Sequence, residues 1–235
     1  MAVAVITGAS RGFGLALAET LGTHGWSLVL DARGAAALDG AAASVRAAAP
    51  GATVRAVAGD VSDPEHRAAL VETASELGGL DLLVNNASLL GPSPQPVLAD
   101  YPLETLRRVY DVNVLGPLGL IQAALPLLRA SGRGAIVDVT SDAAVEGYEG
   151  WGGYGSSKAA LDQLGNVLGA EEPDLRVYSF DPGDMRTQMH QEAFPGDDIS
   201  DRPEPATVVP ALLSLLDERP ESGRYRASER VEAKP

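Results

Sequence analysis

Apolar runs of strand length alternate with helix-length segments along almost the whole chain. Strands that are apolar on both faces and separated by helices form a parallel sheet that helices cover on both sides. Right-handed crossovers between such strands give a doubly wound sheet. We therefore predict an α/β fold, with a long helical region over residues 103–130 that bends near Pro117 and Pro126. The predicted strands are residues 2–7, 27–30, 53–58, 80–84, 135–139 and 175–180.

Length and composition fit one globular domain. The 235 residues include no cysteine, which excludes disulfides, thiolate metal sites and cysteine nucleophiles. With 18 basic and 32 acidic side chains the formal charge is −14, so neither nucleic acid nor an anionic membrane is expected as a partner. No repeat or linker divides residues 1–235, and no signal or membrane-spanning segment is recognisable. We therefore expect a single-domain cytoplasmic protein.

Three irregular stretches follow predicted strands, at residues 88–101, 142–153 and 184–205. The carboxyl ends of parallel strands share one edge of the sheet, where ligands bind in such folds, so we expect these stretches to form a substrate site. Their large apolar side chains favour a partly apolar ketone or aldehyde, and their carboxylates argue against a strongly anionic substrate. The two sets are Tyr148, Trp151, Met185, Met189 and Phe194, and Glu146, Glu149, Glu192, Asp197 and Asp198.

A glycine-rich segment joins the first predicted strand to the first predicted helix. Gly8, Gly12 and Gly14 allow a tight turn, and the free amide groups at the start of a helix favour phosphate. A plain strand-to-helix turn is the alternative interpretation. The segment also contains Gly8-Ala9-Ser10-Arg11-Gly12, which matches the G-x-S-x-G turn of α/β-hydrolases and would make Ser10 a nucleophile.

The hydrolase interpretation needs more than this turn. It requires the turn on a central strand, with an acid and then a histidine downstream. Here the turn follows the first strand, and of the three histidines only His190 is placed to act. None of His24, His66 and His190 has metal-ligand spacing, so no metal site is expected.

Tyr154 and Lys158 are four residues apart and would share one face of a helix. An ammonium beside a phenol favours the phenolate and lowers the phenol pKa from about 10 toward working pH, as a general acid/base for carbonyl–alcohol interconversion requires. A surface pair at chance spacing is the alternative, but chance predicts only about 0.05 such pairs. Arginine would not replace Lys158, because it holds its charge too firmly. Ser141 could hydrogen-bond the substrate oxygen, or simply cap a turn.

Seven motifs, in order, resemble those of the short-chain dehydrogenase/reductase family over nearly the whole chain. They are Thr7-Gly8-Ala9-Ser10-Arg11-Gly12-Phe13-Gly14, Asp60-Val61, Asn85-Asn86-Ala87-Ser88, Asn113, Ser141, Tyr154 with Lys158, and Pro182-Gly183 with Thr187. The family usually has glycine where Ser88 stands. The resemblance implies a Rossmann fold, a nicotinamide cofactor, and catalysis by Asn113, Ser141, Tyr154 and Lys158. It also implies that Asn113 fixes a proton-relay water near Lys158.

The resemblance further implies which residues lie along the cofactor, with Asp60 and Val61 flanking its adenine. The full set is Gly8, Ser10, Arg11, Gly12, Phe13, Gly14, Arg33, Asp60, Val61, Asn86, Ala87, Tyr154, Lys158, Pro182, Gly183 and Thr187. A homodimer or homotetramer is expected by the same resemblance. The residues after Gly223, however, would barely form the family's usual last strand.

Residues 31–33 bear on the choice between NAD and NADP. Asp31 lies nineteen residues after Gly12, close to the place of the acid that binds the ribose hydroxyl of NAD. Counting through Gly25, however, places the family's usual acid at Ala32 and not at Asp31. This one-residue shift matters because neighbouring side chains on a strand point to opposite faces. Arg33, together with Arg11 in the glycine loop, then offers guanidinium groups to a 2′-phosphate. We predict NADP, with NAD still possible.

These observations predict hydride transfer between NADP(H) and a carbonyl or secondary alcohol of a small, partly apolar substrate, with Tyr154 as the general acid/base. The substrate would be a ketone, an aldehyde or an alcohol. Two alternatives stay open: a non-catalytic NAD(P)-binding sensor, and a serine hydrolase that uses Ser10.

Overall fold

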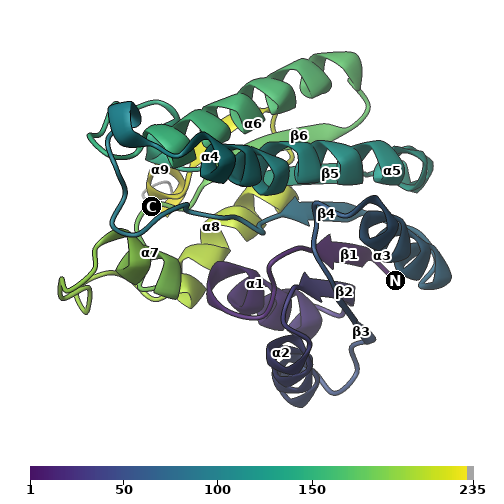
Figure 1. Cartoon of the computed structure of the whole chain (residues 1–235). Coiled ribbons are helices and arrows are strands. Elements are labelled where there is room, and N and C mark those ends of the chain that lie inside the picture. Colours follow the sequence, from purple (N-terminus) through teal and green to yellow (C-terminus); the bar gives the residue numbers. More distant parts are fainter. Residues whose placement is uncertain (232–235) are drawn as a thin grey trace.

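Seven parallel strands form one sheet within residues 1–231, the part of the chain that the computed structural model describes (Figure 1). Their order across the sheet is β3-β2-β1-β4-β5-β6-β7. The strands are β1 Val3–Ile6, β2 Ser27–Ala32, β3 Val54–Ala58, β4 Leu82–Asn85, β5 Ala135–Val139, β6 Arg176–Asp181 and β7 Gly223–Arg226. The predicted doubly wound α/β fold is confirmed.

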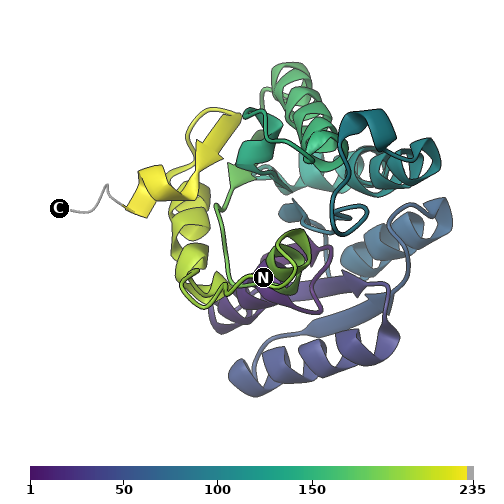
Figure 2. The same ribbon diagram turned by 60° about the vertical axis from the view of Figure 1, so that its left-hand side comes forward.

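Helices cover both faces of the sheet (Figure 2). Consecutive strand residues point to opposite faces, so Ile6 packs in one layer of the core and Val5 in the other. The Ile6 layer lies under α1 (Gly12–Thr23), α2 (Ala35–Ala48) and α8 (Pro205–Glu218). The Val5 layer lies under α3 (Pro64–Glu76), α5 (Gly116–Ser131) and α6 (Gly152–Glu171). Three shorter helices are α4 (Leu103–Tyr110), α7 (Gln188–Ala193) and α9 (Ala227–Val231).

The helical region expected over residues 103–130 consists of α4 and α5, joined by a π-helical turn at Asp111–Leu115. The irregularity therefore comes just before Pro117, as predicted, whereas Pro126 stands inside α5 without ending it. By length and composition alone, Leu103–Ser131 could cross a membrane, but half of its most apolar window is buried inside the fold. The segment packs against α3 and α6 as part of the core.

The order of the strands reverses at β1, which lies between β2 and β4. In an open parallel sheet, ligands bind at the carboxyl edge beside such a reversal, because the connections on its two sides diverge there. The glycine-rich segment follows β1 at this point, and the segment after β4 starts at Asn86. The fold thus brings the two motifs to the same edge.

The last strand, β7, forms more completely than the sequence suggests. Residues Gly223–Arg226 pair in parallel with Tyr178–Asp181 of β6 and end the sheet within residues 1–231. Figure 2 shows this strand in yellow at the edge of the sheet. The expectation that the residues after Gly223 would barely form a strand is therefore corrected, because the β6 backbone supplies the pairing partner.

Candidate active site

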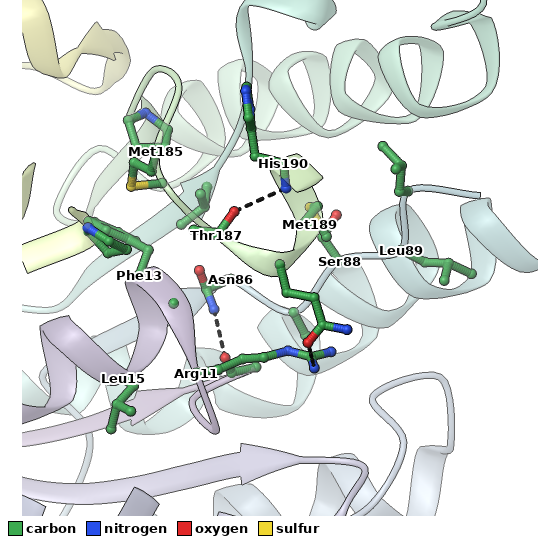
Figure 3. Close-up of a pocket in the computed structure, with 18 of the residues that line it drawn as sticks. Arg11, Phe13, Leu15, Asn86, Ser88, Leu89, Met185, Thr187, Met189 and His190 are labelled. Atoms are coloured by element: carbon green, nitrogen blue, oxygen red, sulfur yellow. Dashed lines mark hydrogen bonds between the residues drawn. The ribbon is translucent and has the colours of Figure 1, made fainter. Parts of the chain in front are cut away.

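A cavity of about 970 Å³ opens at the carboxyl edge of the sheet. Its walls come from the glycine-rich segment, the ends of β2 to β6, and parts of all three stretches that the sequence assigns to the substrate. Figure 3 shows the part of the wall around Arg11, Asn86 and Thr187. Ser88–Leu90, Asp142, Trp151 and residues 184–190 line it, but Tyr148 does not. Among the residues the structure describes, Phe194, Asp197 and Asp198 instead line a smaller neighbouring cavity of about 120 Å³.

The glycine-rich segment has the geometry of a phosphate cradle. Gly8 and Gly12 have φ of +64° and +59°, in the left-handed region that favours glycine. A Cβ on Gly14 would lie 2.6 Å from Nδ2 of Asn86, which donates hydrogen bonds to the carbonyls of Thr7 and Gly8. Helix α1 begins at Gly12 with no side-chain cap, so its first amide groups are free to bind an anion at the cavity. These residues fit the pyrophosphate of a dinucleotide.

The other residues expected along the cofactor also line the cavity, with one qualification. Ser10, Ala87, Pro182, Gly183 and Thr187 all lie in its wall. The ring of Phe13 also packs in the core, stacked on Phe180 with 6.0 Å between ring centroids. Thr187 accepts a hydrogen bond from the amide of His190 and so begins α7, as Figure 3 shows.

Asp60 and Val61 line the same cavity beyond the end of β3. Burial alone would raise the pKa of Asp60, but hydrogen bonds from Ser62 and from Arg108 outweigh it and hold that pKa below its usual range. Arg108 on α4 was not predicted, because nothing in the sequence indicates that α4 lies beside this loop. An ionised Asp60 can accept hydrogen bonds from an adenine.

The three residues that bear on cofactor choice lie in different surroundings. Asp31 is 1% exposed, and its Oδ1 lies 2.7 Å from Nε2 of His66. Burial raises the pKa of Asp31, and the contact with His66 opposes that rise. Arg33 is exposed and lines the cavity, as does Arg11, whose guanidinium donates to Gln188. Asp31 and Arg33 both line the cavity, but the carboxylate of Asp31 is engaged by His66 and by the amide of Gly8, whereas Arg33 is exposed.

Tyr154 and Lys158 lie together on α6, as predicted, and both are buried. Nζ of Lys158 donates to the carbonyl of Val139 at 2.8 Å and lies 5.6 Å from the centroid of the Tyr154 ring. Burial lowers the pKa of Lys158 to about 8, although the nearby carboxylates Asp138 and Asp162 raise it. Lys158 is therefore a cation held at the floor of the cavity.

The expected lowering of the Tyr154 pKa is wrong for this structure. Burial raises the pKa of Tyr154, the carboxylates of Asp181 and Asp142 act in the same direction, and Ser88 opposes them. Burial is the largest of these effects, because the charged phenolate loses its contact with water. The phenol is protonated at neutral pH, which is the state that donates a proton.

Asn113 lies in the π-helical turn and is fully buried. Its Oδ1 accepts from the amide of Leu89 and from Oγ of Ser88, and its Nδ2 donates to the carbonyl of Leu89 and to Oγ of Ser157. The side chain thus holds the segment after β4 against α6. The role in a proton relay that the resemblance implies stays a prediction.

Ser141 fits both interpretations that the sequence left open. Its Oγ donates to Oδ1 of Asp142 and accepts from the amide of Ala143, so it caps the short helical turn that follows β5. It also lines the cavity together with Tyr154. If a substrate oxygen lay between the hydroxyls of Ser141 and Tyr154, the Ser141 hydroxyl would donate to it instead of to Asp142.

The geometry around Ser10 does not favour a hydrolase. Within residues 1–231, no histidine forms a hydrogen bond with Ser10. His24 contacts the carbonyl of Thr20, His66 contacts Asp31, and the ring of His190 lies against Phe194. The same described residues contain no cluster of His, Asp and Glu that could hold a metal ion.

Comparisons with known proteins agree with this site. A family model described as short chain dehydrogenase matches residues 2–198. The chain is 37% identical over 198 residues to a sepiapterin reductase of Xenopus laevis, covering 80% of this chain and 75% of that one. It is 34% identical over 198 residues to a benzil reductase of Saccharomyces cerevisiae, covering 81% and 74%. A solved short-chain dehydrogenase of Shigella flexneri, complexed with NADP, superimposes with a TM-score of 0.90 at 29% identity, covering 97% of each chain.

Proposed function

Because the chain belongs to the short-chain dehydrogenase family, we propose that it reduces the carbonyl of a small, partly apolar substrate with NADPH, using Tyr154 as the proton donor. Family membership makes it an NAD(P)-dependent oxidoreductase. The observation that carries the rest is the placement of Ser141, Tyr154 and Lys158 in the wall of one cavity with the glycine-rich phosphate cradle. A bound dinucleotide and a carbonyl would meet there.

Two features of this chain and one solved relative support NADP over NAD. Arg33 is an exposed cation on the cavity wall and can pair with a 2′-phosphate. Asp31, the acid that could bind a ribose hydroxyl, already contacts His66. The Shigella flexneri protein complexed with NADP has the same fold over 97% of this chain.

The residues of the chain divide the work as follows. The free amides at the start of α1 would bind the pyrophosphate of the cofactor, and Asp60 would receive its adenine. A nicotinamide bound there would supply the hydride for the carbonyl carbon. Ser141 donates a hydrogen bond to the carbonyl oxygen and fixes its direction, and the phenol of Tyr154 gives that oxygen its proton. The Lys158 ammonium then stabilises the phenolate that remains. Alcohol oxidation runs through the same steps in reverse.

The substrate end of the cavity has an aromatic wall. The ring of Trp151 lies 5.9 Å from that of Tyr154, measured between centroids, and both residues line the cavity. It also lies 5.8 Å from the ring of Phe194, which lines the smaller neighbouring cavity. Tyr154 and Trp151 belong to one apolar cluster with Leu90, Ala143, Met189 and Ala193. Such a wall suits a carbonyl that carries a planar ring, since aromatic rings pack edge-to-face at these distances. The carboxylates of Asp142 and Asp184 in the same cavity disfavour anionic substrates.

A spectrophotometric screen tests the proposal. Purified protein is mixed with NADPH or NADH and with benzil, 1-phenyl-1,2-propanedione, acetophenone and benzaldehyde. We expect NADPH-dependent reduction of at least one of them. Tyr154→Phe should lower kcat by roughly 100-fold or more, in the range of a lost general acid, and leave NADPH affinity unchanged.

Three results would count against it. An active Tyr154→Phe variant refutes the assigned proton donor. A strong preference for NADH refutes the assigned cofactor. Tight NADPH binding without turnover of a broad carbonyl and alcohol panel would support a cofactor sensor instead.

A further inference from the structure

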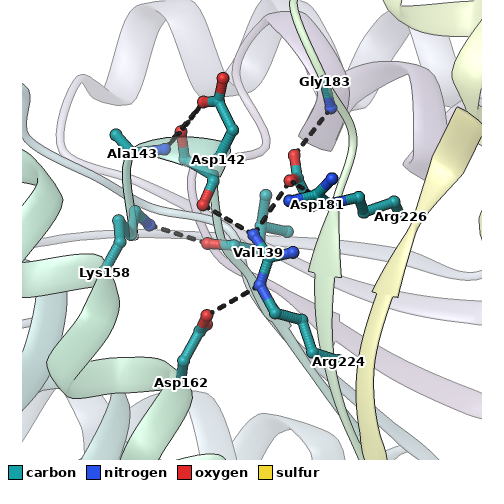
Figure 4. A network of polar contacts seen from close by, with 10 residues as sticks. Val139, Asp142, Ala143, Lys158, Asp162, Asp181, Gly183, Arg224 and Arg226 are labelled. Atoms are coloured by element: carbon teal, nitrogen blue, oxygen red, sulfur yellow. Dashed lines mark hydrogen bonds and ion pairs between the residues drawn. The ribbon is translucent and has the colours of Figure 1, made fainter. Parts of the chain in front are cut away.

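Arg224 of β7 is the centre of a network of charged groups beside the candidate active site (Figure 4). Its Nε donates to Oδ2 of Asp162 at 3.0 Å, and one Nη donates to Oδ2 of Asp181 at 3.0 Å. The same Nη donates to the backbone carbonyl of Ser141 at 2.8 Å. One guanidinium therefore ties together α6, the end of β6 and the segment after β5.

Burial makes these contacts hard to replace. The side chains of Asp162 and Asp181 are 11% and 5% exposed, and that of Arg224 is 20% exposed. A buried charge that loses its partner is strongly unfavourable. Among the described residues, Oδ1 of Asp162 has no hydrogen-bond partner, so the contact from Arg224 is what holds this carboxylate. A planar fork of donors serves acceptors from three elements at once, which a lysine ammonium on a flexible stem does not.

The contact with Ser141 bears on the chemistry. The hydroxyl of Ser141 is hydrogen-bonded to its own neighbours Asp142 and Ala143, so its direction follows the backbone of this short segment. Arg224 fixes the carbonyl of the same residue. A displacement of about 1 Å at a reacting group costs on the order of 100-fold in rate. The position of this carbonyl is therefore a sensitive point.

We propose that Arg224 is a positioning residue for carbonyl reduction, which acts through Ser141 by fixing its backbone carbonyl. This inference rests on the proposed function, in which the Ser141 hydroxyl binds the substrate oxygen. Asp162 and Asp181 anchor the guanidinium from two sides. Asp181 also accepts from the amide of Gly183 at 3.0 Å, so the same anchor begins the turn that carries cofactor-binding residues.

A double-mutant cycle tests the proposal. Arg224→Met, Ser141→Ala and the double variant are compared in the reduction, with NADPH, of whichever ketone of the panel turns over fastest. Arg224→Met is expected to lower kcat by about 10- to 100-fold and to change the NADPH dissociation constant by less than about threefold. In the Ser141→Ala background, the same substitution should change kcat by less than about threefold, because no hydroxyl remains to be positioned. If the fold-loss of kcat in the double variant equals the product of the losses in the two single variants, the proposal is overturned.

Arg226 offers a matched control on the same strand. Its Nε lies 3.9 Å from the same Oδ2 of Asp181, and its side chain is 41% exposed. Among the described residues it makes no hydrogen bond to Ser141 or Asp162. Arg226→Met should leave kcat unchanged. An equal loss of kcat would show that the charge near Asp181 matters rather than the link to Ser141, which also overturns the proposal.

Arg224→Lys replaces Arg224→Met in the test if Arg224→Met does not fold. It keeps the positive charge between the two carboxylates but lacks the fork of donors. If circular dichroism shows that Arg224→Met is unfolded, the same cycle is run with Arg224→Lys and judged by the same criteria. If Ser141→Ala keeps the wild-type kcat, the assigned role of Ser141 in the proposed function fails. If Ser141→Ala is impaired and the losses multiply, only the role of Arg224 fails.

Discussion

The Nε2 atom of His66 lies 2.7 Å from Oδ1 of Asp31, and the two side chains are 8% and 1% exposed. Asp31 lines the cavity close to the sequence position of a ribose-binding acid, but its other oxygen, Oδ2, accepts from the amide of Gly8 at 3.4 Å. The imidazole and the amide of Gly8 thereby engage both oxygens of a carboxylate that could otherwise bind the ribose of NAD. We therefore expect Arg33, rather than Asp31, to decide between NADP and NAD.

Asp31→Asn is therefore expected to leave the ratio of kcat/KM for NADPH to that for NADH within about threefold of the wild type, because the side chain does not bind the ribose. The amide still accepts a hydrogen bond from His66. Initial rates with both cofactors measure the ratio. A large loss of NADH activity alone would show that Asp31 reaches the ribose.

Arg33→Ala should lower kcat/KM for NADPH by roughly 10- to 100-fold, as expected for the loss of hydrogen bonds to a charged group. The value for NADH should stay nearly constant, because NAD lacks the 2′-phosphate. Arg107→Ala is the control, since Arg107 is an exposed arginine of α4 that pairs with Glu104. Equal losses of kcat/KM for both cofactors would show that Arg33 does not bind the 2′-phosphate.

Asp138 gives the fold a dependence on pH. It is fully buried, and burial raises its pKa to about 6 from 3.8, against the hydrogen bond from Asn85 and the attraction of Lys158. Because the folded-state pKa is raised, ionisation costs stability as pH rises from the unfolded value to about 6, by up to about 3 kcal/mol. Asp138→Asn should therefore raise the melting temperature at about pH 8 and not at about pH 4.

Thermal unfolding followed by circular dichroism at both pH values measures this effect. Asp39→Asn on the exposed face of α2 is the control and should show no such difference. Equal shifts for Asp138→Asn at both pH values would mean that ionisation of Asp138 is not the cause.

Ser88 replaces the glycine that is usual in the family and lowers the pKa of Tyr154 against the effect of burial. Ser88→Gly should therefore raise that pKa further. Alcohol oxidation needs the phenolate, so its rate rises with pH as Tyr154 loses its proton. In the variant this rise should occur at higher pH. Ser88→Thr keeps a hydroxyl and should keep the wild-type profile. The rates of alcohol oxidation with NADP⁺ are measured across the alkaline range. An unchanged pH profile in Ser88→Gly would contradict the effect of Ser88 on the pKa of Tyr154.

Two glycines in helices predict opposite effects of alanine. A Cβ on Gly14 would lie 2.6 Å from Nδ2 of Asn86 and 2.7 Å from the carbonyl of Gly8, so Gly14→Ala should destabilise the fold and abolish NADPH binding. A Cβ on Gly40 in α2 would meet nothing within 4 Å. Gly40→Ala should raise the free energy of unfolding by about 0.5–1 kcal/mol. Urea denaturation and NADPH fluorescence measure the two effects.

The sequence predicted well what depends on local pattern. The alternation of apolar runs predicted the sheet, and the spacing of Tyr154 and Lys158 placed them together on α6. What it could not predict depends on burial and on which distant side chains meet in the fold. The pKa of Tyr154 is raised mainly by burial, and the contact between Asp31 and His66 follows from the way α3 brings His66 to β2. Arg224 gave no signal, because its three acceptors are scattered over the chain.

The pairing of β7 with β6 also has a consequence for biosynthesis. A ribosome makes the chain from its amino terminus at about 5–20 residues per second, so Tyr154 and Lys158 emerge several seconds before Arg224. Until β7 adds to the sheet, Asp162 and Asp181 lack their shared arginine, and the carbonyl of Ser141 lacks its donor. The nascent protein thus makes these three contacts beside the candidate active site only after β7 has been synthesised.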